Sequence, residues 1–223
     1  MSIKENLDNV LATIPSSVKL IAVSKMKPAV LIQEAYDAGH RAFGENKVQE
    51  LREKSPILPK DIEWHMIGHL QSNKVKYIAP YVYMIHAVES MKLLKEINKR
   101  AKSNDRVIKV LLQIHIAKEE SKFGFNSEEV MALLSSPEFK ALENIQVAGL
   151  MGMATNTSDT DIIRSEFRGL KTLFDQVHTN FFDKDTFSEI SMGMSNDYQI
   201  AIEEGSTMLR IGTAIFGLRA CAL

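Results

Sequence analysis

Apolar residues along the chain follow two alternating patterns, which predict strands and helices in regular succession. Short, almost continuous apolar runs, of which Val18-Lys19-Leu20-Ile21-Ala22-Val23 is the first, are typical of parallel strands that are covered on both faces. Longer segments carry apolar residues three and four positions apart, as in 160–178, where Ile163, Phe167 and Leu170 form one stripe. This spacing predicts amphipathic helices.

The strand pattern occurs eight times along the sequence. The predicted strands span residues 18–24, 41–44, 62–68, 82–87, 107–116, 145–150, 187–190 and 207–211. Predicted helices follow every strand but the last. Four of them span residues 28–38, 71–78, 89–102 and 160–178, two more begin at residues 45 and 126, and one runs from a cap at Ser195 to about residue 205. One further helix is predicted over 3–13, before the first strand.

Strict alternation of strands and helices predicts a parallel sheet with its helices on the outside. Eight such units in 223 residues predict a single (β/α)8 TIM barrel, in which the N-terminal helix takes the place of the missing last one. A doubly wound open sheet is the structural alternative. No Pro/Gly/Ser-rich linker divides the sequence, so we expect residues 1–223 to form one domain.

Composition and charge narrow the class of protein. The net charge is −1 with interspersed signs, which argues against a nucleic-acid binder that uses a basic face. A single cysteine, Cys221, excludes an internal disulfide and a cysteine-rich metal site, and it is typical of a reducing compartment. Neither a signal-peptide pattern nor an apolar run of ~20 residues is present, so we expect a cytoplasmic protein.

Lys25 follows the first predicted strand directly, and Lys27-Pro28 then opens a helix. In open α/β sheets and in α/β barrels, ligands bind at this carboxyl end of the strands. A solvated loop lysine is the ordinary interpretation of such a residue. The rest of the chain changes that interpretation, because it predicts a phosphate site to accompany the lysine.

The ends of the last two strands carry the pattern of a phosphate site. Ser191-Met192-Gly193-Met194-Ser195 follows the seventh strand, and Arg210-Ile211-Gly212-Thr213 closes the eighth. Small and hydroxyl residues there allow backbone N–H groups to approach an anion, and the loops after strands seven and eight are a frequent phosphate site in barrels. Glycine turns and a serine cap are the alternative interpretation of each segment taken alone.

Strands one, seven and eight become neighbours when a barrel closes, so the lysine and the phosphate site should belong together. The ligand would carry a phosphate and a group that reacts with an amine. Pyridoxal 5′-phosphate (PLP) meets both conditions, because its aldehyde condenses with a lysine amine. Arg210 would then point from the eighth strand toward the ring nitrogen and disfavour its protonation.

The sequence resembles the family of pyridoxal phosphate homeostasis proteins, whose fold is close to the N-terminal barrel of alanine racemase. The matching segments run through most of the chain: Ala22-Val23-Ser24-Lys25, Phe43-Gly44-Glu45-Asn46, Val48-Gln49-Glu50, Trp64-His65-Met66-Ile67-Gly68, Leu70-Gln71-Ser72-Asn73-Lys74, Glu120-Ser121-Lys122-Phe123-Gly124, Gly149-Leu150-Met151, Ser191-Met192-Gly193-Met194-Ser195 and Arg210-Ile211-Gly212-Thr213-Ala214-Ile215-Phe216-Gly217. Two positions depart from the family pattern: Lys47 stands where members often have tyrosine, and His69 where many have proline.

The resemblance implies a role for individual residues. It implies that Lys25 carries the cofactor as a Schiff base and that Arg210 meets the pyridine nitrogen. The residues that it implies for the phosphate are Ser191, Gly212 and Thr213, and those that it places beside the cofactor are Asn46 and Met151. Lys122, after the fifth strand, is a candidate for contacting the cofactor or passing it on, with a plain loop charge as the alternative.

Other chemistry receives little support from the sequence. His65 and His69 are four residues apart but straddle Gly68 at a strand end, so we expect no metal site. The sequence contains no Walker loop, no Gly-x-Gly-x-x-Gly fingerprint and no Gly-x-Ser-x-Gly elbow.

Three functions remain open. The one that we favour is a PLP carrier that buffers the cofactor in the cell and supplies it to apo PLP-dependent enzymes, without catalysis of its own. The second is an amino-acid racemase or related enzyme with weak activity. Racemisation needs an acid/base group on each face of the substrate carbon, whereas the sequence offers no second domain with the tyrosine that alanine racemase uses. For the same reason we expect a monomer. The third is a Schiff-base aldolase acting on a sugar phosphate.

Overall fold

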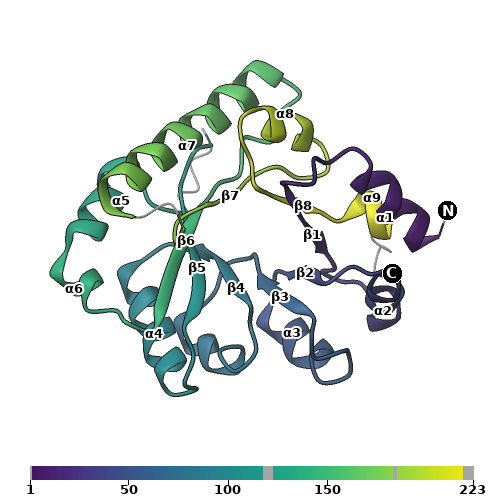
Figure 1. Ribbon diagram of the computed structural model, residues 1–223, viewed down its shortest axis with the longest axis horizontal. Coiled ribbons are helices and arrows are strands. Elements are labelled where there is room, and N and C mark those ends of the chain that lie inside the picture. The colour runs from purple at the N-terminus through teal and green to yellow at the C-terminus, as the bar shows by residue number, and fades with distance from the viewer. Residues whose placement is uncertain (1, 118–122, 183–184, 218–223) are drawn as a thin grey trace.

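The computed structural model describes residues 2–117, 123–182 and 185–217, and its strands form one closed barrel (Figure 1). All eight strands are parallel, each pairs with the next along the chain, and the last pairs with the first. They are β1 (Lys19–Val23), β2 (Ala42–Glu45), β3 (Glu63–Met66), β4 (Met84–Val88), β5 (Ile108–Gln113), β6 (Ile145–Met151), β7 (Glu189–Ser191) and β8 (Met208–Ile211). The predicted barrel is confirmed, and the open-sheet alternative is wrong.

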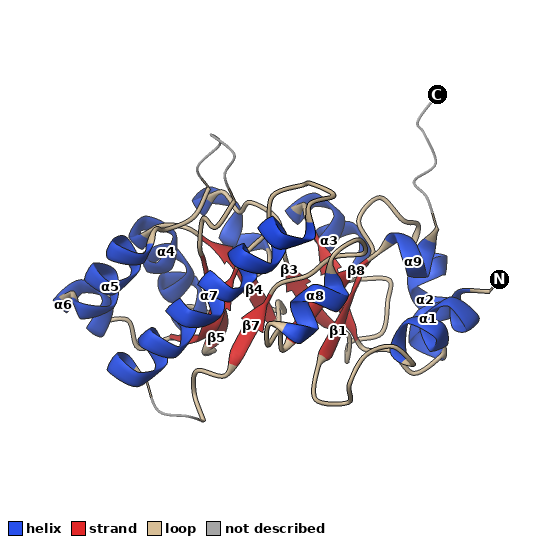
Figure 2. Ribbon diagram, turned by 90° about the horizontal axis from the view of Figure 1, so that it is seen from above, coloured by secondary structure: helices blue, strands red, loops and turns tan. Residues whose placement is uncertain are grey.

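Helices surround the barrel and join its strands (Figures 1 and 2). They are α1 (Ile3–Leu11), α2 (Ala29–Asp37), α3 (Val48–Lys54), the 3₁₀ helix η1 (Ser72–Tyr77), α4 (Met91–Lys102), α5 (Ser127–Ser135), α6 (Pro137–Lys140), α7 (Thr160–Phe181), α8 (Tyr198–Glu203) and α9 (Thr213–Phe216). Within the described ranges, no helix has both the length and the apolar character needed to cross a membrane.

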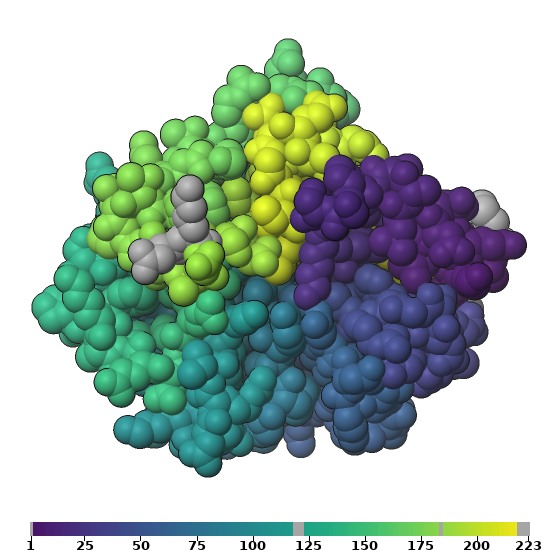
Figure 3. Space-filling view, viewed as in Figure 1, coloured from purple at the N-terminus to yellow at the C-terminus, as the bar shows by residue number. Residues whose placement is uncertain are grey.

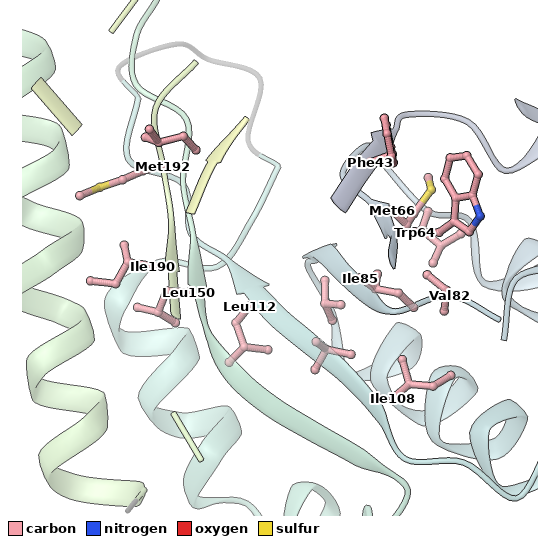
Figure 4. Packing of buried hydrophobic residues seen from close by; sticks show 14 of the residues in the cluster. Phe43, Trp64, Met66, Val82, Ile85, Ile108, Leu112, Leu150, Ile190 and Met192 are labelled. Carbon is pink, nitrogen blue, oxygen red and sulfur yellow. The ribbon is translucent and has the colours of Figure 1, made fainter. Parts of the chain in front are cut away.

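The main core lies between the strands and the helices. Leu112, Leu150 and Ile190 are register partners on β5, β6 and β7, and all three are buried (Figure 4). Successive residues of a strand face opposite sides of the sheet, so Leu111 and Met151 face the inside of the barrel. There they belong to a second, smaller apolar cluster with Met84, Ala87, Ala148 and Met208.

The N-terminal helix α1 contacts α9 and α2, as Figure 1 also shows, so it covers the part of the barrel where the first and last strands meet. In Figure 3 the purple N-terminal residues lie directly against the yellow C-terminal ones. The register of β1 with β8, which pairs Lys19 with Met208 and Ala22 with Ile211, produces this contact. Lys25 and the loop after β8 are therefore brought to the same end of the barrel.

Three predicted details were wrong. The helix expected to begin at Glu45 begins at Val48, because Glu45 belongs to β2. The helix expected from a cap at Ser195 begins at Tyr198, because Asp197 Oδ1 accepts the Met194 N–H and closes a turn first. The last strand is followed by the four-residue helix α9 where none was expected.

Candidate functional site

A cavity of about 320 Å³ opens at the carboxyl ends of the strands. Its walls come from the segments that follow β1, β2, β3, β6, β7 and β8, together with one residue of α7. The described residues that line it are Val23, Lys25, Asn46, Ile67, Met153, Ala154, Thr155, Asn156, Thr157, Ile163, Met194, Ser195, Asn196, Asp197, Arg210, Gly212 and Thr213. Five of the residues predicted for the site are thus brought together: Lys25, Asn46, Arg210, Gly212 and Thr213.

The half-buried Lys25 stands in the loop after β1, and its two chain neighbours are tied to one network of buried charges. Ser24 Oγ donates to Glu45 Oε1 (2.6 Å), and Lys54 Nζ donates to both Glu45 Oε1 (2.8 Å) and the Ser24 carbonyl (3.0 Å). Lys54 Nζ also donates to Glu50 Oε2 (2.8 Å), which in turn accepts the Met26 N–H (2.6 Å).

The two carboxylates that share Lys54 differ in the direction of their pKa. Burial raises the pKa of Glu45 to about 7, although Lys54 and the Ser24 hydroxyl work against the shift. Burial also acts to raise the pKa of Glu50, but hydrogen bonds from Lys54 and Met26 outweigh it, so the pKa of that carboxyl lies below its ordinary value. The difference follows depth, because the Glu45 side chain is fully buried and that of Glu50 is 16% exposed.

Gly212 brings the start of α9 close to β1 on another wall of the cavity. A Cβ at this position would lie 2.9 Å from the Val23 carbonyl oxygen, so a larger residue would push the two strands apart. Thr213 is exposed at the first position of α9. The first N–H groups of a helix have no acceptor within the helix, so the backbone here suits an anion.

Arg210 supplies the positive charge at the base of the cavity. Its Nη1 donates to Ser191 Oγ (2.5 Å) and its Nη2 to the Gly152 carbonyl (2.9 Å), so the guanidinium is fixed from two sides. Burial lowers the pKa of Arg210 to about 10, against the opposing effect of Asp197. The group therefore remains charged at neutral pH.

A chain of hydrogen bonds leads from Arg210 into the barrel. His86 Nδ1 lies 3.0 Å from Ser191 Oγ, and His86 Nε2 lies 2.8 Å from His65 Nδ1. Burial, with nearby positive groups and, for His65, with His86, lowers the pKa of both imidazoles well below its ordinary value, so both are neutral.

The first bond of this chain has a fixed direction. An arginine only donates, so Ser191 Oγ accepts from Arg210. For the second bond we assign the Ser191 hydroxyl as the donor and His86 Nδ1 as the acceptor, because this gives the buried hydroxyl proton an acceptor. His86 then carries its proton on Nε2 and donates to His65. We assign these tautomers from the pattern of donors and acceptors. His65 Nε2 ends the chain without a hydrogen-bond partner in the part of the protein that the structure describes.

The remaining predicted residues lie elsewhere. Ser191 and Met151 are fully buried below the cavity and are not among the described residues that line it. Lys122 lies outside the described residues. Of the two departures from the family pattern, Lys47 is exposed just before α3, and His69 Nδ1 pairs with Glu89 Oε1 at 2.9 Å. His65 and His69 therefore have separate partners.

Sequence reasoning missed Asp197, Glu45 and His86. Asp197 is buried in the wall of the cavity, and its position in Ser195-Asn196-Asp197 was the available signal. Its carboxylate is occupied by the Met194 N–H, so it shapes the loop. Burial raises the pKa of Asp197, whereas the Met194 N–H and Arg210 act to lower it.

An amine, a buried guanidinium and a small-residue backbone meet in one cavity. This arrangement suits an anionic ligand with a carbonyl group that reacts with an amine.

The family model described as "Alanine racemase, N-terminal domain" matches residues 1–220, which defines the class of barrel. The chain is 40% identical over 233 residues to the pyridoxal phosphate homeostasis protein of Vibrio alginolyticus, with 98% of each covered. It is also 40% identical over 202 residues to that of Aquifex aeolicus, covering 90% of this chain and 87% of the relative. The chain belongs to the family of pyridoxal phosphate homeostasis proteins.

Solved structures show the same relation. The structure of PipY of Synechococcus elongatus PCC7942 with PLP bound has a TM-score of 0.87 and 36% identity, covering 97% of this chain and all of that one. An alanine racemase of Clostridium difficile 630 has a TM-score of 0.78, with 97% of this chain and 56% of that chain covered. Its identity is 15%, so this likeness concerns the fold alone.

Proposed function

We propose that this protein binds PLP as a Schiff base on Lys25, buffers it in the cell and supplies it to apo PLP-dependent enzymes. The observation that carries the proposal is that one cavity holds Lys25, Arg210 and the Gly212-Thr213 backbone. The names of the relatives and the PLP bound to PipY support it.

The cavity suits the cofactor in size and in chemistry. Its volume of about 320 Å³ lies at the small end of ligand pockets. Gly212 and Thr213 would offer their backbone to the phosphate, and Arg210, whose guanidinium is oriented by Ser191, would meet the ring nitrogen. Asn46 lines the wall and Met151 supports it from below.

PLP supplies an aldehyde, and its ring can withdraw electrons from groups attached there. Lys25 would hold the cofactor by condensing its amine with the aldehyde, with loss of one water molecule. Arg210 would oppose protonation of the ring nitrogen by its charge and so weaken that withdrawal. Ser191 contributes by orienting Arg210. For Lys122 we retain the proposal that it contacts the cofactor or passes it on.

A carrier agrees better with the cavity than a racemase does. Racemisation requires a second acid/base group across from the lysine, and no tyrosine is present among the described residues that line the cavity. The barrel shared with alanine racemase is the observation that favours the second candidate, a racemase with weak activity. We expect a monomer that is located in the cytoplasm.

Absorption spectroscopy of the purified protein tests the binding proposal. Wild type, Lys25→Ala and Lys47→Ala are compared with and without added PLP, then reduced with borohydride and analysed by intact mass and peptide mapping. Lys47 is the matched control, because it is an exposed lysine beside the cavity residue Asn46. We expect a Schiff-base band and one reduced cofactor on Lys25 in wild type and in Lys47→Ala. Equal spectra for wild type and Lys25→Ala would contradict the proposal and return the sugar-phosphate aldolase to consideration.

Transfer and turnover are separated in a second experiment. Holo-protein is mixed with an apo PLP enzyme, and in parallel with D- and L-amino acids. A carrier activates the acceptor and leaves the amino acids unchanged. Stereoinversion that depends on Lys25 would favour the racemase.

A further inference from the structure

We propose that Glu45, Lys54 and Glu50 form a clamp that positions Lys25 for attachment of its ligand by fixing the residue on either side of it. The inference rests on the proposed function of Lys25. The clamp joins three elements: Glu45 comes from β2, Lys54 and Glu50 from α3, and the segment that they hold is the loop after β1.

Ser24, before Lys25, is held by both side chain and backbone. Its hydroxyl donates to Glu45 Oε1, and its carbonyl accepts from Lys54 Nζ. Ser24 is fully buried, and its N–H donates to the Gly44 carbonyl of β2 at 3.0 Å. The chain therefore enters the Lys25 position in one fixed direction.

Met26, after Lys25, is held in a conformation that its side chain does not favour. Its φ is +60°, in the left-handed region that residues with a long side chain rarely occupy. The side chain is 61% exposed, so packing does not account for this conformation. The Met26 N–H instead donates to Glu50 Oε2 at 2.6 Å, a short bond to a charged acceptor.

Backbone strain of this kind persists only where the surroundings hold it, and it concentrates at functional sites. Lys54 connects both anchors, because the same Nζ donates to Glu45 and to Glu50. Lys25 and Met26 are the two central residues of a turn that the Lys27 N–H and the Ser24 carbonyl close at 3.1 Å, so the lysine stands at the tip of a fixed loop. Fixing an amine in this way reduces the orientational entropy lost when it attacks.

Glu50→Ala tests the clamp, with Glu53→Ala as its matched control. Glu53 lies one turn from Glu50 on the same helix, is exposed, and accepts from Gln49. Glu50→Gln is the conservative variant, because its amide oxygen can still accept the Met26 N–H. Two quantities are measured: hydrogen exchange at residues 24–27 of the protein without ligand, and the rate of PLP attachment to Lys25 followed by absorbance and borohydride trapping.

In Glu50→Ala we expect faster exchange at residues 24–27 and attachment slowed by about tenfold, as the loss of a hydrogen bond to a charged group predicts. Glu53→Ala should match wild type in both measurements, and Glu50→Gln should recover most of the wild-type rate. A role confined to stability would change the unfolding midpoint without distinguishing Glu50→Gln from Glu50→Ala in the rate of attachment.

Met26→Gly provides an independent test, because glycine adopts a positive φ without strain. We expect Glu50→Ala to slow attachment less in the Met26→Gly background than in wild type. Equal effects in the two backgrounds, or equal rates for Glu50→Ala and Glu53→Ala, would overturn the clamp while leaving PLP binding intact. If PLP attaches to Lys25 in none of the proteins, the proposed function fails, and hydrogen exchange alone decides whether the clamp exists.

Discussion

Two clusters of buried polar groups lie beside the cavity, one next to Lys25 and one below Arg210, and they are built differently. The first consists of Glu45, Lys54 and Glu50 and is charged, with Lys54 and Glu50 10% and 16% exposed. The second consists of Ser191, His86 and His65, all fully buried and neutral. The cluster that carries charge is thus the one that solvent partly reaches, at Lys54 and Glu50, whereas the cluster below Arg210 consists of neutral, fully buried groups.

The difference shows how each cluster can orient a cationic side chain. A carboxylate close to Lys25 can hold the backbone through strong, charge-assisted bonds. Beneath Arg210, a protonated histidine would repel the guanidinium, and Arg210 is indeed among the groups that lower the pKa of His86. A chain of neutral imidazoles orients Ser191 without adding a second positive charge.

The largest loss in the free energy of unfolding is expected for Lys54→Met, which removes the cation from the charged cluster. Glu45 and Glu50 would both lose the cation that they share, and breaking a buried pair in this way costs about 3–5 kcal/mol at a pH above 7, where Glu45 is ionised. Urea unfolding measures the change. A loss below about 1 kcal/mol would mean that the pair behaves as a surface ion pair.

A smaller loss in the free energy of unfolding is expected for His86→Leu, which interrupts the neutral cluster. Ser191 Oγ then keeps only its bond from Arg210, and His65 Nδ1 loses its partner His86. The penalty for unsatisfied buried groups is about 1–3 kcal/mol. His69→Leu is the control, because the His69 side chain is 53% exposed and its Nδ1 pairs with Glu89 at the surface. Equal losses in the two variants would contradict the assigned chain of hydrogen bonds.

The smallest change in the free energy of unfolding is expected from a change in pH, but its sign distinguishes the two clusters most clearly. Glu45, which faces Lys54 and Glu50, has a pKa of about 7 when folded, above its ordinary value. The folded protein therefore binds more protons than the unfolded one between the two values. The contribution of Glu45 to stability is present below its unfolded pKa and is lost as pH rises toward 7.

His65 and His86 act in the opposite direction, because their pKa values are lowered on folding. Their contribution is present above the unfolded pKa and is lost as pH falls. Between about pH 5 and pH 6.5, the unfolding free energy should thus change by up to roughly 1.4 kcal/mol per pH unit and proton. The sign of this change should be opposite for the difference between wild type and Glu45→Gln and for the difference between wild type and His86→Leu. If the free energy of unfolding changed with pH in the same direction for both differences, the contrast between the two clusters would be refuted.

The sequence predicted most of the fold because its two periodicities differ and alternate eight times. Capping groups helped: a helix was predicted to begin at 126, and Asn126 is the N-cap of α5, where it forms a capping box with Glu129. The start of α8 was missed because Asp197 uses its carboxylate on the loop before the helix.

The cavity was predictable where a residue's role depends on its place at a strand end, as for Lys25, Gly212 and Thr213. The supporting clusters were not. Both faces of each strand are buried, so apolar patterning does not reveal whether His65 and His86 face the helices or the inside of the barrel. Glu45 was predicted to begin a helix, whereas it is the last residue of β2.

The pairing of β1 with β8 also governs when the site comes into existence. Lys25 is synthesised early and Gly212 late, and the cavity has both of its walls only after the two strands meet. Such distant pairings form late in folding, because a long loop must close first. A nascent chain on the ribosome therefore presents Lys25 before the wall that contains Gly212 is in place, and a ligand that needs both recognises only the completed fold. Ligand binding then stabilises the finished barrel, since it favours the folded state alone.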